Sequence, residues 1–173
     1  MPDKGTDRQR RLERKKIMNK EAARKIALKY LNILKPYCTR IEIAGSIRRE
    51  KPEVKDIEIV AIPGNIESFA REVNKLQKVK GEPTGKYTQR ILPEGISLDL
   101  FIANEKNWGL IFAIRTGSAN FSHKILACGW VKKGCHSKDG KLIDKQGREI
   151  ILREEEDLFD LIGIPFLKPE LRF

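Results

Sequence analysis

The chain has 173 residues, of which 40% are hydrophobic and 34% charged, and its formal net charge is +11. This composition excludes a disordered chain, because it supplies enough apolar surface for one sizeable core or for two small lobes. No apolar run approaches the roughly 20 residues that span a bilayer, and the charged N-terminus lacks the apolar core of a signal peptide. We therefore expect a protein of the cytoplasm, or of a viral or phage replication compartment, that is not secreted and has no membrane partner.

The N-terminal residues 1–18 are rich in charge and poor in apolar side chains. They predict a basic, mobile arm that either touches a phosphate backbone or only aids solubility. Asn19 is a good helix cap and Pro36 a helix stop, so we predict a helix from Asn19 to about Leu34. Its apolar face is formed by residues at 3–4 spacing, namely Ala23, Ile26, Ala27, Tyr30, Leu31 and Leu34.

The next segments alternate between apolar and polar residues, as strands do. "RIEIAGS" and "DIEIVAI" predict two strands, and Ile66 to Leu76 predicts a second amphipathic helix. Three more strands or hairpin arms follow, in "QKVKGEP", "KYTQRILP" and "ISLDLFI".

After Asn104 the pattern changes to helices, then to short strands with Asp-Gly and Gln-Gly turns, and finally to an acidic helix that Gly163 ends. We therefore predict an α+β fold in which a mixed sheet has helices on one side. The predicted domains are the arm at 1–18, a larger lobe at 19–104 and a smaller α/β lobe at 105–173.

Three carboxylates are candidates for a metal site. Residues i and i+2 of a strand share a face, so Asp56 and Glu58 project together while Ile57 faces the core. Asp99 lies on the polar face of a later strand, and all three carboxylates meet if the two strands are neighbours. Such like charges are costly without a cation, and oxygen ligands suit magnesium or manganese.

A small-residue turn precedes these carboxylates. Gly45 and Ser46 let backbone N–H groups approach a phosphate, and Arg48 and Arg49 add planar forks that suit phosphate oxygens. Phosphate-binding residues that are followed in the chain by metal-binding carboxylates indicate that the ligand is a nucleoside triphosphate whose phosphates bridge the metal ions.

The cysteines give no disulfide framework, because Cys38, Cys128 and Cys135 are odd in number and widely spaced, which favours free thiols. The spacing of Cys128 and Cys135 with His123 and His136 matches no standard zinc finger, so we favour a buried thiol and surface polar groups over a zinc site.

At this point the sequence resembles a known family. "GSIRR…DIEIV" is similar to the nucleotidyltransferase signature of the DNA polymerase beta superfamily. "KYTQRILPEGISLDLFI", "RTGSANFSHKI" and "EEDLFDLIGIPFLKPELR" resemble later segments of the family X polymerases, over residues 19–173 in all. The resemblance implies a palm and a C-terminal lobe without the family's lyase and helix-hairpin-helix domains, as in very small viral members.

The resemblance also implies roles for individual residues. Asp56, Glu58 and Asp99 would be the catalytic residues and would hold two Mg²⁺ or Mn²⁺ ions, with Asp99 helping to activate the primer 3′-hydroxyl. The implied nucleotide-binding residues are Gly45, Ser46, Arg49, Gly117 and Ser118. Weaker correspondences place Lys20, Asn120, Ser122 and Lys124 against nucleic acid.

Some positions depart from the family pattern. Glu58 stands where Asp is usual, and Ile114-Arg115 replace an aromatic pair that helps to exclude a ribose 2′-hydroxyl. Ser122 and Leu126 replace an Asn and an Arg that lie near the nascent base pair and the template.

Three functions are consistent with these residues. The first is a compact, monomeric DNA polymerase that adds dNTPs to the primer of a gapped duplex, in short-gap filling or DNA repair. The second is a template-independent terminal nucleotidyltransferase on DNA or RNA, and the third is a non-catalytic nucleic-acid-binding module. The positive charge suits all three, since it attracts polyanions.

Overall fold

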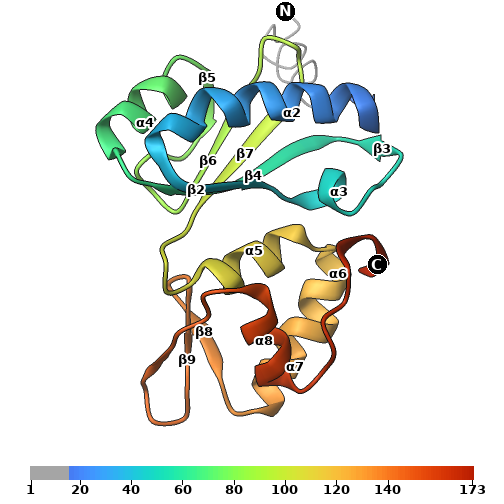
Figure 1. The fold of residues 1–173 in the computed structure, drawn as a ribbon, viewed down its shortest axis with the longest axis vertical. Helices are drawn as coiled ribbons and strands as arrows, with labels where there is room; N and C mark the ends of the chain where they lie inside the picture. The colour runs from blue at the N-terminus through green and yellow to red at the C-terminus, as the bar shows by residue number, and fades with distance from the viewer. Residues whose placement is uncertain (1–15) are drawn as a thin grey trace, which may run out of the picture.

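The computed structural model describes residues 16–173, which form two lobes stacked one above the other (Figure 1). The upper lobe consists of β1 (Met18–Asn19), α2 (Lys20–Leu34), η1 (Lys35–Tyr37), β2 (Cys38–Ile43), α3 (Gly45–Arg48), β3 (Glu53–Val54), β4 (Asp56–Pro63), α4 (Ile66–Val73), β5 (Gln77–Lys80), β6 (Tyr87–Ile91) and β7 (Ser97–Ile102). The lower lobe consists of α5 (Trp108–Thr116), α6 (Ala119–Phe121), the π-helical η2 (Ser122–Ala127), α7 (Cys128–Lys132), β8 (His136–Lys138), β9 (Lys141–Ile143), β10 (Glu149–Ile150), α8 (Glu155–Ile162) and η3 (Pro169–Leu171).

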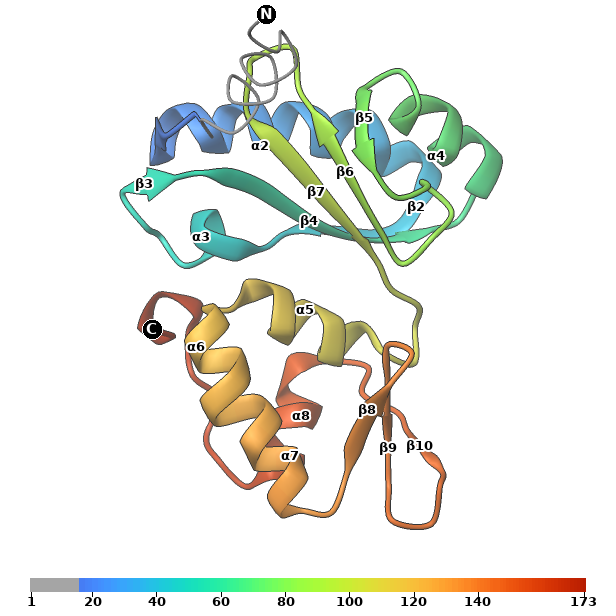
Figure 2. The same cartoon turned by 180° about the vertical axis from the view of Figure 1, so that it is seen from behind.

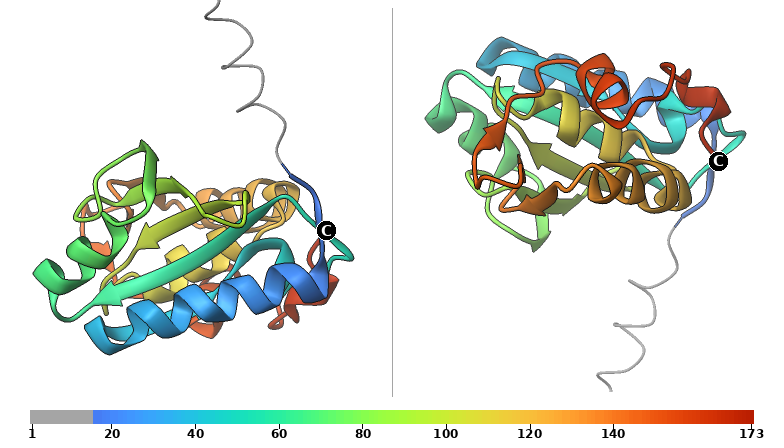
Figure 3. Two further views of the ribbon diagram at one scale, coloured as in Figure 1. Left: turned by 90° about the horizontal axis from the view of Figure 1, so that it is seen from above. Right: turned by 90° about the horizontal axis from the view of Figure 1, so that it is seen from below.

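A five-stranded sheet in the order β2-β4-β7-β6-β5 organises the upper lobe. Only β4 and β7 pair in parallel, and the other neighbours are antiparallel, so the sheet is mixed. Helices α2 and α4 cover one face of this sheet, and α2 runs along the length of β4 when the protein is seen from above (Figure 3). The predicted α+β class is therefore confirmed.

The helix-covered face of the sheet holds the main apolar core. The strand residues that alternate with the carboxylates are fully buried against α2, as the strand period requires. Asn19 caps α2 as predicted, since its side-chain oxygen accepts a hydrogen bond from the Ala22 backbone N–H at 2.9 Å. The core residues include Ala27, Leu34, Ile57, Ile59, Phe69, Leu98 and Leu100.

The lower lobe has its own core, formed by α5, α6, η2, α7 and α8, and the hairpin of β8 and β9 flanks these helices. Figure 2 shows that the chain enters this lobe once, between β7 and α5. A third apolar cluster joins Val60 and Phe101 of the sheet to Trp108 and Phe112 of α5. The sheet face opposite α2 is therefore turned toward the lower lobe.

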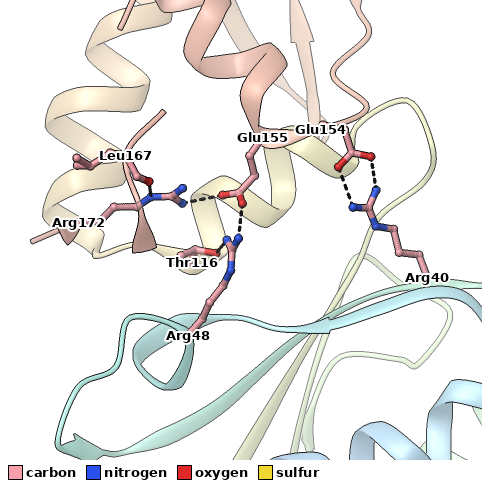
Figure 4. A network of polar contacts seen from close by, with 7 residues as sticks. All are labelled: Arg40, Arg48, Thr116, Glu154, Glu155, Leu167 and Arg172. Atoms are coloured by element: carbon pink, nitrogen blue, oxygen red, sulfur yellow. Dashed lines mark hydrogen bonds and ion pairs between the residues drawn. The ribbon is translucent and has the colours of Figure 1, made fainter. Parts of the chain in front are cut away.

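Two sets of ionic contacts also join the lobes (Figure 4). Arg40 of β2 forms a two-pronged ion pair with Glu154, just before α8. Arg48 of α3 donates to the Thr116 hydroxyl at 2.7 Å and to Glu155 at 2.5 Å. Arg172, which is fully buried, donates to the second oxygen of Glu155 at 2.6 Å, so one carboxylate links both arginines.

Several details differ from the sequence-based expectations. The predicted turn at Gly45 is a single helical turn, α3, and Met18, predicted to end the arm, pairs with Val54 in the short β1–β3 ladder. The rest of the predicted arm, residues 1–15, lies outside the described residues. The three cysteines are free thiols, as predicted. Among residues 16–173, no helix combines the length and apolarity needed to cross a bilayer.

Candidate active site

Two carboxylates lie opposite each other on neighbouring parallel strands. In the β4–β7 pair, Glu58 is the partner of Asp99, and Asp56 is the partner of Ser97. Because alternate residues of a strand share a face, Asp56, Glu58 and Asp99 all lie on the face turned toward the lower lobe. The condition set by the sequence, that the two strands be neighbours, is met.

The local electrostatics reflect this crowding. Burial, followed by the nearby charge of Asp99, raises the pKa of Glu58 to about 7, with Asp56 adding to the rise and Arg49 opposing it. Negative charge therefore accumulates at a site that is only partly hydrated. A bound cation would relieve this repulsion.

The chemistry of the donors fits a hard divalent cation, since all three side chains offer carboxylate oxygens. Across residues 16–173, no group of three or more His, Cys, Asp or Glu side chains is arranged so that it could hold a metal ion. The fit to a cation therefore rests on the chemistry of these donors and on their place on one face of the sheet.

Gly45 provides the space for Glu58. Its φ is +62°, in the left-handed region, and a Cβ atom added there would lie 1.6 Å from Glu58 Oε2. The Glu58 carboxyl group is thus packed against the first residue of α3. Only glycine permits this approach, so the phosphate-binding candidate and the carboxylate candidates form one site.

A cavity of about 590 Å³ opens beside these residues. Basic and acidic side chains both line it, which is the charge pattern expected for metal-bound phosphates. The charged and polar lining residues include Ser46, Arg49, Lys51, Lys55, Asp56 and Glu58. Lys51 and Lys55 were not singled out from the sequence, although their positions between Arg49 and Asp56 place them in the same short segment.

Arg49 connects this cavity to the lower lobe. Its guanidinium donates to the Thr116 carbonyl oxygen, and its buried Nε has no hydrogen-bond partner. Burial lowers the pKa of Arg49, while the Glu58 charge opposes that shift. Arg49 therefore has an unused donor beside the cavity.

Gly117 and Ser118 follow directly after this contact. Gly117 has a φ of +69°, and a Cβ atom there would lie 2.9 Å from the Arg49 Nη1 atom. The Ser118 hydroxyl oxygen caps α6 by accepting from the Phe121 N–H at 3.1 Å. The structure thus brings the Thr-Gly-Ser segment next to Arg49, and so next to the carboxylate strands.

The comparisons with known proteins point in one direction. Residues 112–173 match the model of the DNA polymerase beta thumb family. In fold, 99% of the chain superposes on 84% of polymerase beta from Leishmania infantum, solved as a ternary P/T complex, with a TM-score of 0.73 and 18% sequence identity. No curated protein matches the chain in sequence.

The chain has a fold similar to that of polymerase beta. Residues 112–173, which make up most of the lower lobe, match the polymerase beta thumb. The resemblance to family X polymerases that the sequence motifs indicated is therefore confirmed by the overall fold and by the thumb match.

The residues that the sequence placed against nucleic acid are distributed over both lobes. Lys20 begins α2, where its ammonium group pairs with Glu50 at 2.8 Å. Asn120 and Lys124 are exposed on α6 and η2, whereas the Ser122 hydroxyl donates to the Ile114 carbonyl oxygen at 2.8 Å. The structure does not gather these residues at one point, and their DNA contacts stay a prediction.

The structure places two of the residues that depart from the family X pattern, Leu126 and Arg115. Leu126 is fully buried in the lower-lobe core, so it is not a surface residue near a template. Arg115 turns its guanidinium over the Phe101 ring, 4.2 Å from the centroid. The pKa of Arg115 is lowered, because burial of its guanidinium outweighs the opposing electrostatic interactions with Glu58, Tyr87 and Asp99.

Sequence reasoning also missed Tyr87, which contacts one of the three carboxylates. The Tyr87 hydroxyl donates to Asp99 Oδ1 at 2.8 Å, and burial together with this bond raises the pKa of Tyr87, so the phenol keeps its proton. The motif "KYTQRILP" contains this tyrosine, but its partner is fixed by strand register, which the motif alone does not specify.

Proposed function

We propose that this polymerase beta-like protein is a DNA polymerase that adds dNTPs to a primer 3′-hydroxyl, in short-gap filling or DNA repair. One observation carries the proposal. Glu58 and Asp99 are partners across parallel strands, directly beside a cavity that also presents Ser46 and Arg49. Acidic and phosphate-binding groups are thereby adjacent, as nucleotidyl transfer requires.

Each part of the site has a distinct task in this proposal. Ser46 and Arg49 bind the β- and γ-phosphates of the nucleotide, and Gly45 allows their close approach. The turn at Gly117 and Ser118 supports the incoming sugar and base. Catalysis then comes from holding the primer end and the nucleotide in line and from stabilising the charge that develops on the phosphates.

Two Mg²⁺ or Mn²⁺ ions complete the proposed site. Asp56 and Glu58 would hold the ion that accompanies the nucleotide, and Asp99 joins them at the catalytic ion. When bound, these ions neutralise phosphate charge and make the primer hydroxyl more acidic. The raised pKa of Glu58 supports this assignment, because burial and the charges of Asp99 and Asp56 disfavour its ionised form, which a bound cation would favour.

DNA is the proposed macromolecular partner, and the neighbouring Leishmania polymerase beta was solved as a ternary P/T complex. The net charge of +11 supports a strong phosphate-backbone contribution to binding. Affinity should therefore fall steeply as salt is raised. We propose that the protein works as a monomer.

The test is primer extension on a one-nucleotide-gapped duplex, with each of the four dNTPs supplied separately and with Mg²⁺ or Mn²⁺. The wild type is compared with Asp99→Ala and with Glu67→Ala, a control that removes an exposed acidic residue of α4. Addition of the complementary nucleotide, lost in Asp99→Ala and kept in Glu67→Ala, supports the polymerase. If the wild type binds DNA but adds no nucleotide, the polymerase is excluded and the non-catalytic nucleic-acid-binding module is favoured.

A terminal nucleotidyltransferase is the second candidate, and two observations favour it. The Ser122 hydroxyl donates its hydrogen bond to the Ile114 carbonyl oxygen, and Leu126 is buried. Neither side chain is therefore available to contact the edge of a base pair. Equal addition of all four nucleotides in the same experiment would identify this activity.

A further inference from the structure

Tyr87 and Asp99 form a diagonal pair on adjacent antiparallel strands. In the β6–β7 ladder, Tyr87 is the partner of Phe101 and Gln89 is the partner of Asp99. Tyr87 therefore lies on the same sheet face as Asp99, two residue pairs along the ladder. Its hydroxyl reaches back along the ladder to Asp99 Oδ1 at 2.8 Å.

We propose that Tyr87 is a positioning residue that fixes the orientation of the Asp99 carboxylate for nucleotidyl transfer. This inference rests on the proposed function. Asp99 is only 9% exposed, so little solvent is available to orient it, and a hydrogen bond from a rigid donor restricts the directions in which its oxygens can point.

The donor is held rigidly by a stack of three side chains. The Tyr87 ring lies on the Phe101 ring, with centroids 5.0 Å apart and planes 21° from parallel. The guanidinium of Arg115 lies 4.2 Å from the centroid of the same Phe101 ring. An aromatic ring packed in this way cannot swing its hydroxyl away without losing the stack.

The stack also extends across the two lobes. Tyr87 and Phe101 belong to the sheet, whereas Arg115 comes from the last turn of α5 in the thumb. The orientation of Asp99 is thus supported by a residue that immediately precedes the Thr116-Gly117-Ser118 segment.

A phenol suits this task better than a cationic donor. Lys or Arg at the same place would neutralise Asp99 and compete with a metal ion for it. Tyrosine donates a hydrogen bond without contributing a positive charge, so the carboxylate keeps the charge that a cation needs.

A matched pair elsewhere in the chain provides the control. The Tyr30 hydroxyl donates to Glu94 Oε2, also at 2.8 Å, on the opposite side of the sheet and outside the proposed site. Tyr30→Phe and Tyr87→Phe therefore remove the same kind of bond. Only the second variant removes it from a proposed catalytic carboxylate.

The first measurement is single-turnover filling of the one-nucleotide gap over a range of dNTP concentrations. We expect Tyr87→Phe to lower the rate at saturating dNTP about 10- to 100-fold, the effect of losing a hydrogen bond to a charged group, while the half-saturating dNTP concentration changes less than about twofold. Tyr30→Phe should leave both values within about twofold of the wild type.

The second measurement does not depend on activity. Urea unfolding in metal-free buffer is followed for Tyr87→Phe, Asp99→Ala and the double variant, and for Tyr30→Phe combined with Asp99→Ala. Because Asp99→Ala removes the acceptor oxygen, we expect Tyr87→Phe to shift the unfolding midpoint in the wild type but hardly at all in the Asp99→Ala background. The Tyr30→Phe shift should be the same in both backgrounds.

The outcomes separate the inference from the proposed function. Normal gap filling by Tyr87→Phe beside an active wild type overturns the positioning role and leaves the polymerase proposal intact. Additive midpoint shifts for Tyr87 and Asp99 overturn the pairing itself. A wild type that adds no nucleotide defeats the proposed function, and the positioning role falls with it.

If Tyr87→Phe does not fold, a second variant, Phe101→Leu, tests the same inference. Phe101→Leu keeps the Tyr87 hydroxyl but removes the ring that holds it, so we expect a several-fold loss of rate. An unchanged rate in that variant would overturn the inference.

Discussion

Arg40 and Glu154 face each other across the two lobes in a two-pronged ion pair, with both N–O distances at 2.8 Å. The same guanidinium lies 4.2 Å from the centroid of the Trp108 ring. Charge and stacking therefore act together at the junction between β2, α5 and the start of α8.

This junction gives the first prediction. Glu154→Gln should lower the free energy of unfolding by no more than about 1 kcal/mol, because the pair is solvent-exposed. Arg40→Ala should cost about 0.5–1 kcal/mol more, because it also removes the stacking on Trp108. Urea unfolding at low and high salt checks this, and only the Glu154 contribution should shrink with salt. Equal losses in the two variants would contradict a role for the stack.

In the network that links Arg48, Glu155 and Arg172, removing the buried Arg172 should lower stability far more than removing the exposed pair does. Arg172 is fully buried and donates to Glu155 and to the Leu167 carbonyl, so Arg172→Ala leaves the Glu155 carboxylate short of a partner. We expect a loss of about 3–5 kcal/mol in the free energy of unfolding. Arg153→Ala, which alters an exposed arginine just before α8, is the control and should change stability by less than about 0.5 kcal/mol. Similar effects in both variants would argue against the network.

Gly45 allows a test that separates backbone strain from steric contact. Gly45→Ala introduces a side chain at a φ of +62° and drives its Cβ into the Glu58 carboxyl group. Gly147→Ala has a comparable φ of +80°, but its Cβ would meet nothing within 4 Å. We expect Gly147→Ala to cost about 1 kcal/mol and Gly45→Ala clearly more than about 2 kcal/mol, measured by urea unfolding. The loss of gap filling should be confined to Gly45→Ala.

The cysteines should differ in reactivity. Burial raises the pKa of Cys38 to about 11, whereas Cys128 is exposed. Iodoacetamide at pH 8 should label Cys128 and spare Cys38 until the protein is unfolded, as mass spectrometry of the digested protein would report. Because the folded thiol holds its proton more tightly than the unfolded one, this group favours folding less as pH rises from about 9 to about 11. Equal labelling of both cysteines in the folded protein would contradict the burial of Cys38.

Local sequence rules predicted the secondary structure well wherever a single residue sets a boundary. Asn19 starts α2, Gly163 ends α8 in the left-handed conformation, and the Asp-Gly turn joins β8 to β9. These features depend on neighbours in the chain, which the sequence displays directly.

The parts of the site that could not be predicted depend on register and on contacts between distant segments. The Tyr87–Asp99 bond requires one particular alignment of β6 with β7, and the Arg49–Thr116 contact joins segments 67 residues apart. The π-helical η2, which contains the buried Leu126, is also not predicted by the local sequence pattern. None of these is visible in a motif.

The parallel pairing of β4 with β7 also bears on how the protein reaches its active form. Parallel neighbours cannot be joined by a tight hairpin, and here α4, β5 and β6 all lie between the two strands in the chain. Glu58 and Asp99 therefore meet only through a contact of high sequence separation, and closing such a loop slows folding. During refolding, helical signal from α2 should return before the carboxylates are together, and the proposed nucleotide addition should be detectable only when the β4–β7 strand pair has formed.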